Sequence, residues 1–204
     1  MRYEPDYKAK TREKVLGEAA RTMRVEGVQG MGVAAVMAKA GLTHGAFYAH
    51  FASKDELIDE TIKAMILEAR GRFEAVTEGL APADALRAYV TFYLSTRHRD
   101  NTASSCPLPW VATEVPRLGA PSRKRYGAAV AGLSELVATK LRALDRPHAD
   151  ANADTDALSL ASSIVAELIG ALSLARAVAE KSQSDAILAR SRAGILARLG
   201  LDPG

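Results

Sequence analysis

The stretch that decides the fold reads GLTHGAFYAHFASKDEL and spans residues 41–57. Residues 33–39, just before it, carry apolar side chains at helical spacing, and Gly41 is the type of residue that best ends a helix. Ser53 and Glu56 have the spacing of a capping box, which starts a helix. Two short helices that meet at a glycine and are followed by a longer helix are typical of a helix-turn-helix unit. In such a unit the second short helix enters the major groove of DNA.

The expected recognition helix, residues 44–50, has an inner and an outer face. Phe47 and Phe51 are four residues apart, so we expect both rings to face the core. The outer face then carries residues that can contact DNA, and Thr43 can also cap the helix. The predicted DNA-binding residues are Thr43, His44, Gly45, Ala46, Tyr48, His50 and, at the start of the next helix, Lys54.

These residue types suit contact with DNA for different reasons. Gly45 has no side chain, so the helix can approach the DNA closely. Tyr48 and His50 can donate hydrogen bonds to phosphates, and Thr43 can bond a phosphate or touch a thymine methyl group. Lys54 lies in the first turn of a helix, where its ammonium group and the free N–H groups can hold one phosphate together.

The rest of the chain predicts helices and no strands. Ala and Leu are abundant, aromatic residues make up 5% of the chain, and alternating apolar segments and hairpin turns are missing. We expect nine helices, at about residues 6–24, 33–39, 44–50, 54–78, 82–98, 110–115, 122–144, 155–180 and 184–199. Residues 145–154, rich in Asp and Ala, predict an exposed connection. The predicted fold class is all-α, with a three-helix domain at residues 1–53 and six helices at residues 54–204.

Charge and composition narrow the range of partners. Residues 1–54 hold nine Lys and Arg against five Asp and Glu, whereas residues 55–204 hold eighteen against nineteen. The basic part is the part with the helix-turn-helix pattern, which suits a surface that faces phosphates. One cysteine, Cys106, excludes an internal disulfide framework. We find neither a signal-peptide core nor an apolar run that approaches a membrane span, so we expect a cytoplasmic protein without a membrane partner.

Residues 6–60 resemble the N-terminal DNA-binding domain of the TetR family of bacterial transcriptional repressors. The resemblance lies in the pattern AGLTxGxFYxHFxSKxxL at residues 40–57. It implies that Tyr48 and Lys54 clamp phosphates and that the residues at 43–46 face base edges. One position departs from the family: Gly32 stands where a Thr usually caps the helix and touches a phosphate. Glycine can cap a helix, but it makes no side-chain contact.

The resemblance also implies a second domain, at residues 54–204, for ligand binding and dimerisation. Its helices would enclose a cavity for a small, often hydrophobic molecule. Candidate lining residues are Met65, Tyr89, Phe92, Tyr93, Thr96, Cys106, Trp110 and Tyr126. The last two helices of each subunit would form a four-helix bundle across a dimer axis. We therefore predict a homodimeric, ligand-responsive repressor that binds a palindromic operator and is released by a small effector; the sequence leaves activation open.

Three alternatives remain at this stage. Cys106 precedes a predicted helix and follows Arg97, His98 and Arg99, so it is either a reactive thiol that senses oxidants or electrophiles, or an inert buried thiol. An enzyme is the second alternative. A di-iron centre needs Glu-x-x-His pairs, and none occurs; a Cys106 nucleophile with His98 as base would lack a Gly-rich oxyanion loop and a third orienting group. His44 and His50 are six residues apart, on different faces of a helix, so they do not indicate a metal site. We therefore expect no catalytic residues, metal or cofactor. An architectural DNA-binding protein without an effector is the third alternative.

Overall fold

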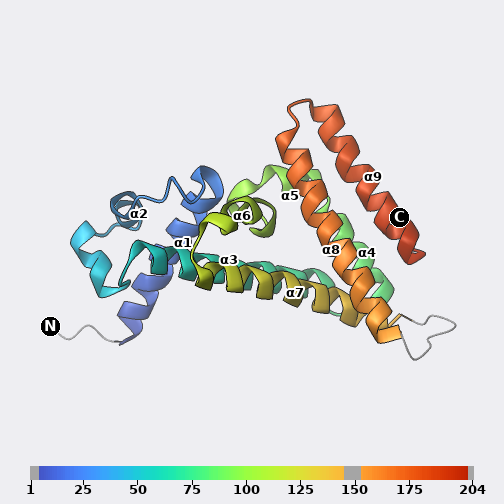
Figure 1. Cartoon of the computed structure of the whole chain (residues 1–204), viewed down its shortest axis with the longest axis horizontal. Coiled ribbons are helices and arrows are strands. Elements are labelled where there is room, and N and C mark those ends of the chain that lie inside the picture. Colours follow the sequence, from blue (N-terminus) through green and yellow to red (C-terminus); the bar gives the residue numbers. More distant parts are fainter. Residues whose placement is uncertain (1–4, 145–152, 202–204) are drawn as a thin grey trace. The chain divides into compact units, whose positions relative to one another are not determined.

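The structure is a computed structural model that describes residues 5–144 and 153–201 (Figure 1). All regular secondary structure in these ranges is helical. The α-helices are α1 (Pro5–Glu26), α2 (Val33–Lys39), α3 (Lys54–Thr77), α4 (Pro82–Tyr93), α5 (Thr96–Asp100), α6 (Leu108–Glu114), α7 (Ala120–Arg142), α8 (Ala153–Ala177) and α9 (Lys181–Leu199). Three short 3-10 helices accompany them: η1 (His44–Ala49), η2 (Thr102–Ser104) and η3 (Val115–Arg117). The predicted all-α fold class is confirmed.

The chain packs into two compact units. The first unit combines residues up to Glu68 with Thr102–Tyr126, and the second combines Ala69–Asn101 with residues from Gly127 onward. These units are defined by packing. The predicted division at residues 53 and 54 is one of function, and it stays a prediction.

The core of the first unit consists mainly of apolar side chains from α1, α2, the recognition element and α3. Most of the buried side chains come from these four elements. They are Val15, Ala19, Ala20 and Met23 of α1; Val36 and Met37 of α2; Phe47 of η1 and Phe51 just after it; and Leu57, Ile58, Ile62 and Met65 of α3. A helix that buries one such stripe gains about 1.5–3 kcal/mol for each large apolar side chain removed from water. The predicted burial of Phe47 and Phe51 is therefore confirmed.

The turn between α2 and α3 follows the sequence signals with two differences. Gly41 has a φ angle of +71°, a conformation that other L-residues rarely adopt. The recognition element, η1, is a 3-10 helix instead of an α-helix, and Thr43 adopts an extended backbone without a capping hydrogen bond from its side chain. Thr43 stands at the N-cap position, but the expectation that its side chain caps this helix was wrong, because its hydroxyl accepts no hydrogen bond from the first turn.

The capping box at the start of α3 is confirmed. The Glu56 N–H donates to Ser53 Oγ at 3.1 Å. The Glu56 carboxylate reaches back to accept from the Ala52 N–H at 2.6 Å, one residue before the Ser53 N–H that a standard capping box uses. These two hydrogen bonds fix residues 52–56, so the chain passes from the recognition element into α3 in a defined direction.

In the second unit, one predicted helix is divided in two. We expected a single helix at residues 82–98, but α4 ends at Tyr93 and α5 begins at Thr96. Ser95 causes the break, because its hydroxyl donates to the Phe92 carbonyl at 2.7 Å and accepts from the His98 N–H at 3.1 Å. Among the described residues, seven α-helices therefore follow η1, where six were expected.

The start of α9 also differs from the expectation. The helix expected at residues 184–199 begins earlier, because α9 starts at Lys181 and Glu180 is its cap. The Glu180 carboxylate accepts from the N–H groups of Ser182 and Gln183 at 3.0 and 2.7 Å. Ser184 is buried, and its hydroxyl donates to the Ala175 carbonyl at the end of α8.

Helix α8 packs against α9, and its side chains Ala161, Val165, Leu168, Leu172 and Ala175 are buried within the chain. Its segment Asp156–Ala177 is long and apolar enough to cross a membrane, with a mean hydropathy of 1.8. The expectation that the chain has no apolar run approaching the length of a membrane span was therefore wrong. The core helix of a soluble protein passes the same test. Residues 145–152 of the predicted exposed connection lie outside the described residues.

Hydrogen bonds of Arg99 and Arg176 connect α5 to α8 and α9. The Arg99 guanidinium donates to the Ser184 hydroxyl at 2.8 Å and to the Asp185 carboxylate at 2.5 Å. Arg176 of α8 donates to the carbonyls of His98 and Arg99 at 3.1 and 3.2 Å. These bonds satisfy carbonyls at the end of α5, a helix too short to be stable alone.

The buried imidazole of His98 makes folding stability depend on pH. It is 4% exposed and stacks on the Phe92 ring at 5.1 Å, and burial lowers its pKa to about 4. Because an unfolded His has a pKa of about 6.5, the neutral group contributes stability above that pH, and this contribution is lost as the pH falls towards 4. We expect the free energy of unfolding to drop by about 2 kcal/mol between about pH 7.5 and about pH 5.

Urea unfolding of the wild type and of His98→Phe at several pH values checks this prediction. The variant keeps an aromatic ring for the stack and cannot take up a proton. Its pH dependence should therefore be flatter than that of the wild type over this interval. Identical pH profiles for the two proteins would show that His98 is not the titrating group.

Candidate nucleic-acid interface

The recognition element presents one aromatic ring to the core and the next to solvent. Phe47 is 1% exposed and stacks on Phe51, with ring centroids 5.6 Å apart. Tyr48 follows directly and is 68% exposed. Successive residues of a 3-10 helix point about 120° apart, so anchoring Phe47 in the core turns Tyr48 outward. The Tyr48 ring makes an edge contact with the Phe47 ring, with centroids 5.2 Å apart, and most of its surface stays open to solvent.

Gly41 and Gly45 differ in whether the backbone requires glycine. Gly41 needs to be glycine because of its positive φ angle. Gly45 has an ordinary backbone, and a Cβ atom added there would meet no atom of the protein within 4 Å. The fold therefore does not require glycine at position 45.

The other predicted DNA-binding residues lie close by in the same unit. Thr43 and His44 are exposed at the start of η1, and the His44 ring makes an edge contact with Tyr48 at 6.4 Å. Lys54 is exposed at the first position of α3. Ala46 is only partly exposed because it packs against the core.

His50 lies between this surface and α1. It is partly buried, and its Nδ1 atom is buried without a hydrogen-bond partner among the described residues. Burial lowers its pKa, and the positive charges of Lys8 and Arg12 lower it further. The free protein therefore holds a neutral imidazole beside a basic helix, where an added phosphate would favour the charged form.

The eight candidate effector residues fall into two groups. Met65, Cys106, Trp110 and Tyr126 belong to the first unit, and Tyr89, Phe92, Tyr93 and Thr96 belong to the second. In the first unit Met65 is fully buried in the core, and Trp110 and Tyr126 pack against that core. The Tyr126 hydroxyl donates to the Leu108 carbonyl at 3.3 Å. The Trp110 Nε1 donor is buried and has no partner in the part of the chain that the structure describes.

In the second unit two aromatic candidates on α4, Tyr89 and Tyr93, lie against each other. The Tyr89 ring meets Phe73 at 4.5 Å and Tyr93 at 5.7 Å. Thr96 is exposed at the first position of α5. That the two groups line one cavity stays a prediction.

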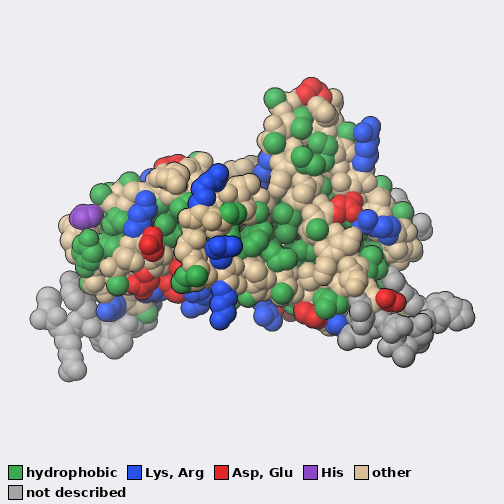
Figure 2. All heavy atoms as spheres, in the orientation of Figure 1, with side chains coloured by type: hydrophobic (Ala, Val, Ile, Leu, Met, Phe, Trp, Pro, Cys, Tyr) green, Lys and Arg blue, Asp and Glu red, His purple; other side chains and the backbone are tan. Residues whose placement is uncertain are grey.

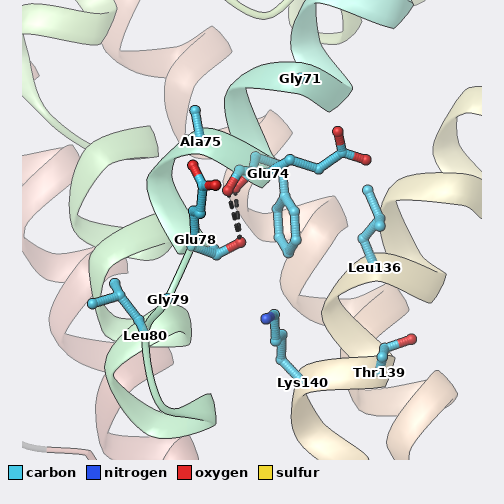
Figure 3. A pocket seen from close by; sticks show the side chains of 11 residues that line it. Gly71, Glu74, Ala75, Glu78, Gly79, Leu80, Leu136, Thr139 and Lys140 are labelled. Atoms are coloured by element: carbon cyan, nitrogen blue, oxygen red, sulfur yellow. Dashed lines mark hydrogen bonds between the residues drawn. The ribbon is translucent and has the colours of Figure 1, made fainter.

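The second unit has a pocket that sequence reasoning missed (Figure 3). It measures about 600 Å³ and lies between the C-terminal end of α3 and the helix α7. Its lining includes Phe73, Leu80, Leu136, Glu74, Glu78 and Lys140, and none of the eight candidates. The sequence carries no local signal for it, because its two walls are about 60 residues apart along the chain.

The single cysteine is enclosed. Cys106 is 5% exposed and two residues before the start of α6. Burial of this kind is typical of an inert thiol. Among the described residues, no group of three or more His, Cys, Asp and Glu side chains is placed to hold a metal ion.

Two family models match the chain in the order in which its elements occur. Residues 15–61 match the model for bacterial regulatory proteins of the tetR family, and residues 82–190 match the model for the tetracyclin repressor-like C-terminal domain. The second match alone covers more than half of the chain. The chain belongs to the TetR family of bacterial regulatory proteins. It is thus a transcription regulator with an N-terminal helix-turn-helix domain and a C-terminal helical domain.

Solved structures of TetR-family regulators share this fold. A TetR transcriptional regulator from Chloroflexus aurantiacus is 22% identical, with a TM-score of 0.75 and 96% of each chain covered. The TetR-family regulator from Cytophaga hutchinsonii is 20% identical, with a TM-score of 0.78, and covers 97% of this chain and 98% of its own. The reduced form of NemR from E. coli is 21% identical, with a TM-score of 0.75, and covers 91% of this chain and 95% of its own. A search of curated proteins finds no match.

Proposed function

We propose that this TetR-family regulator is a repressor that binds a palindromic DNA operator as a homodimer and is released by a small, hydrophobic effector. The observation that carries the DNA-binding part is the recognition element, in which buried Phe47 holds Tyr48 out at 68% exposure. Exposed Lys54 follows at the start of α3. In this proposal residues 1–53 bind DNA, and residues 54–204 bind the effector and form the dimer.

The proposed contacts sort into two kinds. Tyr48, His50 and Lys54 contact phosphates, which position the protein on the duplex. Thr43, His44, Gly45 and Ala46 face base edges in the major groove, where sequence is read. The glycine that the fold does not need and the two exposed residues before it support the second assignment.

The proposed dimer forms through α8 and α9. Leu174, near the C-terminal end of α8, is 59% exposed. Figure 2 shows hydrophobic side chains at the surface over α8 and α9, near the top of the view. Apolar side chains that gather on the outside of packed helices mark surfaces that a partner covers. A second copy of these two helices would complete a four-helix bundle.

The effector is proposed to be small and mainly apolar, because the eight candidate residues are mostly aromatic or aliphatic. A buried indole N–H without a partner at Trp110 adds one donor that a ligand can use. We propose no catalytic role, and a cytoplasmic location follows from operator binding. The thiol-sensor alternative receives no support from the geometry, since Cys106 is 5% exposed.

Selection of random duplex DNA by the purified protein, at a fixed salt concentration and with the mass of the complex determined in parallel, tests the proposal. An enriched inverted repeat bound by two subunits is the expected result. Dimers that bind without sequence preference would favour an architectural protein. A compound library is then screened for ligands that raise the melting temperature and release the selected operator.

Thr43 and His44 should control sequence preference rather than overall affinity. We expect Thr43→Ala and His44→Ala to lower the discrimination at one or two operator positions by about 1–3 kcal/mol for each base pair. Binding to unrelated DNA should change little, because no phosphate contact is lost. Affinities for the selected operator and for its single-base variants measure this effect. A uniform loss across all variants would move these residues to the phosphate-contacting group.

A further inference from the structure

An acidic face on the first turns of α3 meets arginines from two other helices of the first unit. Glu56, Asp59 and Glu60 are spaced three and four residues apart, so they share one side of the helix. Arg125 of α7 approaches this side, and so does Arg12 of α1. The three helices are distant in sequence, and these charges join them.

The contact with α7 has the geometry of a strong ion pair. Arg125 Nε donates to Asp59 Oδ1 at 3.0 Å and Arg125 Nη2 to Asp59 Oδ2 at 2.5 Å, two parallel bonds between a guanidinium and a carboxylate. The buried Ser122 hydroxyl adds a bond to Asp59 Oδ1 at 3.3 Å. The bond from Arg125 lowers the pKa of Asp59. The Asp59 side chain is 16% exposed, so solvent screens this pair less than a surface pair.

Glu60 connects the two arginines. One carboxylate oxygen of Glu60 lies 3.6 Å from Arg125 Nη2, and the other accepts from Arg12 Nη1 at 3.3 Å. Arg12 also lies 3.7 Å from the Glu56 carboxylate, the group that caps the start of α3.

Arg12 in turn reaches the recognition element. Its guanidinium carbon lies 4.7 Å from the centre of the Phe51 ring, within the range of a cation–π contact. Phe51 stacks on Phe47, the core anchor of η1. An unbroken line of contacts therefore runs from the first turns of α7, across α3 and α1, to the residue that fixes the direction of Tyr48.

We propose that Arg125 is a positioning residue for the DNA-binding turn, which it holds in place through the carboxylates of Asp59 and Glu60. The inference rests on the proposed function, because the turn is taken to read DNA. Arg125 itself does not touch DNA in this proposal. A displacement of the start of α7 that weakens the pair with Asp59 releases Arg12 and loosens the recognition element.

Two near-isosteric variants and their combination test the inference. Arg125→Gln and Asp59→Asn each remove one charge of the pair. Each should lower the affinity for the selected operator by about tenfold, and the double variant should be no weaker than the weaker single variant. The slope of log affinity against log salt should stay that of the wild type, because no phosphate contact is lost. Additive losses, or a smaller slope for Arg125→Gln, would overturn the proposal.

Arg123→Gln is the matched control, since it removes the same charge from an exposed position on the same turn of α7. Hydrogen exchange of the amides at residues 44–51, measured without DNA, is the second readout. It should speed up in Arg125→Gln and Asp59→Asn and stay unchanged in the control. Unchanged exchange in all three variants would overturn the proposal. If the wild type selects no DNA, the proposed function fails, while the exchange measurement still decides this inference.

Discussion

Replacing Lys54 with alanine is expected to weaken binding to every DNA sequence by roughly 30-fold, because a dimer loses two phosphate contacts of about 1 kcal/mol each. Lys54 is exposed at the first position of α3, where its charge adds to the free N–H groups of the helix. The slope of log affinity against log salt should fall by about two, one for each subunit. Fluorescence anisotropy with the selected operator and with unrelated DNA, at several salt concentrations, measures both quantities.

Lys124→Ala is the control for this prediction. Lys124 is an exposed lysine on α7, outside the recognition element and the start of α3. Its removal changes the net charge equally and should leave the salt slope as it is. If Lys54→Ala and Lys124→Ala behave alike, the effect comes from net charge and Lys54 does not clamp a phosphate.

The neighbours Phe47 and Tyr48 should separate stability from DNA binding. Phe47 is 1% exposed in the core of the first unit, so Phe47→Ala should lower the free energy of unfolding by about 3–5 kcal/mol. Tyr48 is 68% exposed, so Tyr48→Ala should change that free energy by less than about 1 kcal/mol while it weakens binding to all DNA. Urea unfolding followed by circular dichroism measures the first effect, and anisotropy measures the second.

The two variants also test the orientation of the recognition element. A large loss of stability in Tyr48→Ala would mean that its ring packs in the core. Normal stability in Phe47→Ala would mean that the element is not anchored as described. Either result would remove the observation on which the proposed DNA contact depends.

Local patterns predicted most of the first unit. The helical spacing of apolar residues at 33–39, the glycine at position 41 and the capping box at Ser53 each depend on neighbours within a few residues. Their outcome is decided by steric limits and by hydrogen bonds that form inside the same turn. The exposed residues of the recognition element follow from the position of Phe47, so this candidate site was also predictable from the sequence.

The misplaced boundaries lie where two local options have similar energies. Ser95 and Ser184 are both acceptable inside a helix and at its cap. Ser95 became a cap because it bonds both sides of the break between α4 and α5. Ser184 became a core residue because the Ala175 carbonyl and Arg99 bond its hydroxyl, and Glu180 took over the cap.

The sequence by itself determined the fold class, the helix-turn-helix with its inner and outer faces, and the resemblance to the TetR family, because these rest on spacings of a few residues. Only the tertiary structure decided which distant residues meet. The ion pair between Asp59 and Arg125 and the hydrogen bond from Arg99 to Ser184 of α9 each join positions tens of residues apart. The division of the effector candidates between two units also depends on contacts between distant segments. No short-range pattern marks such partners, because their energies depend on packing that forms only when the helices come together.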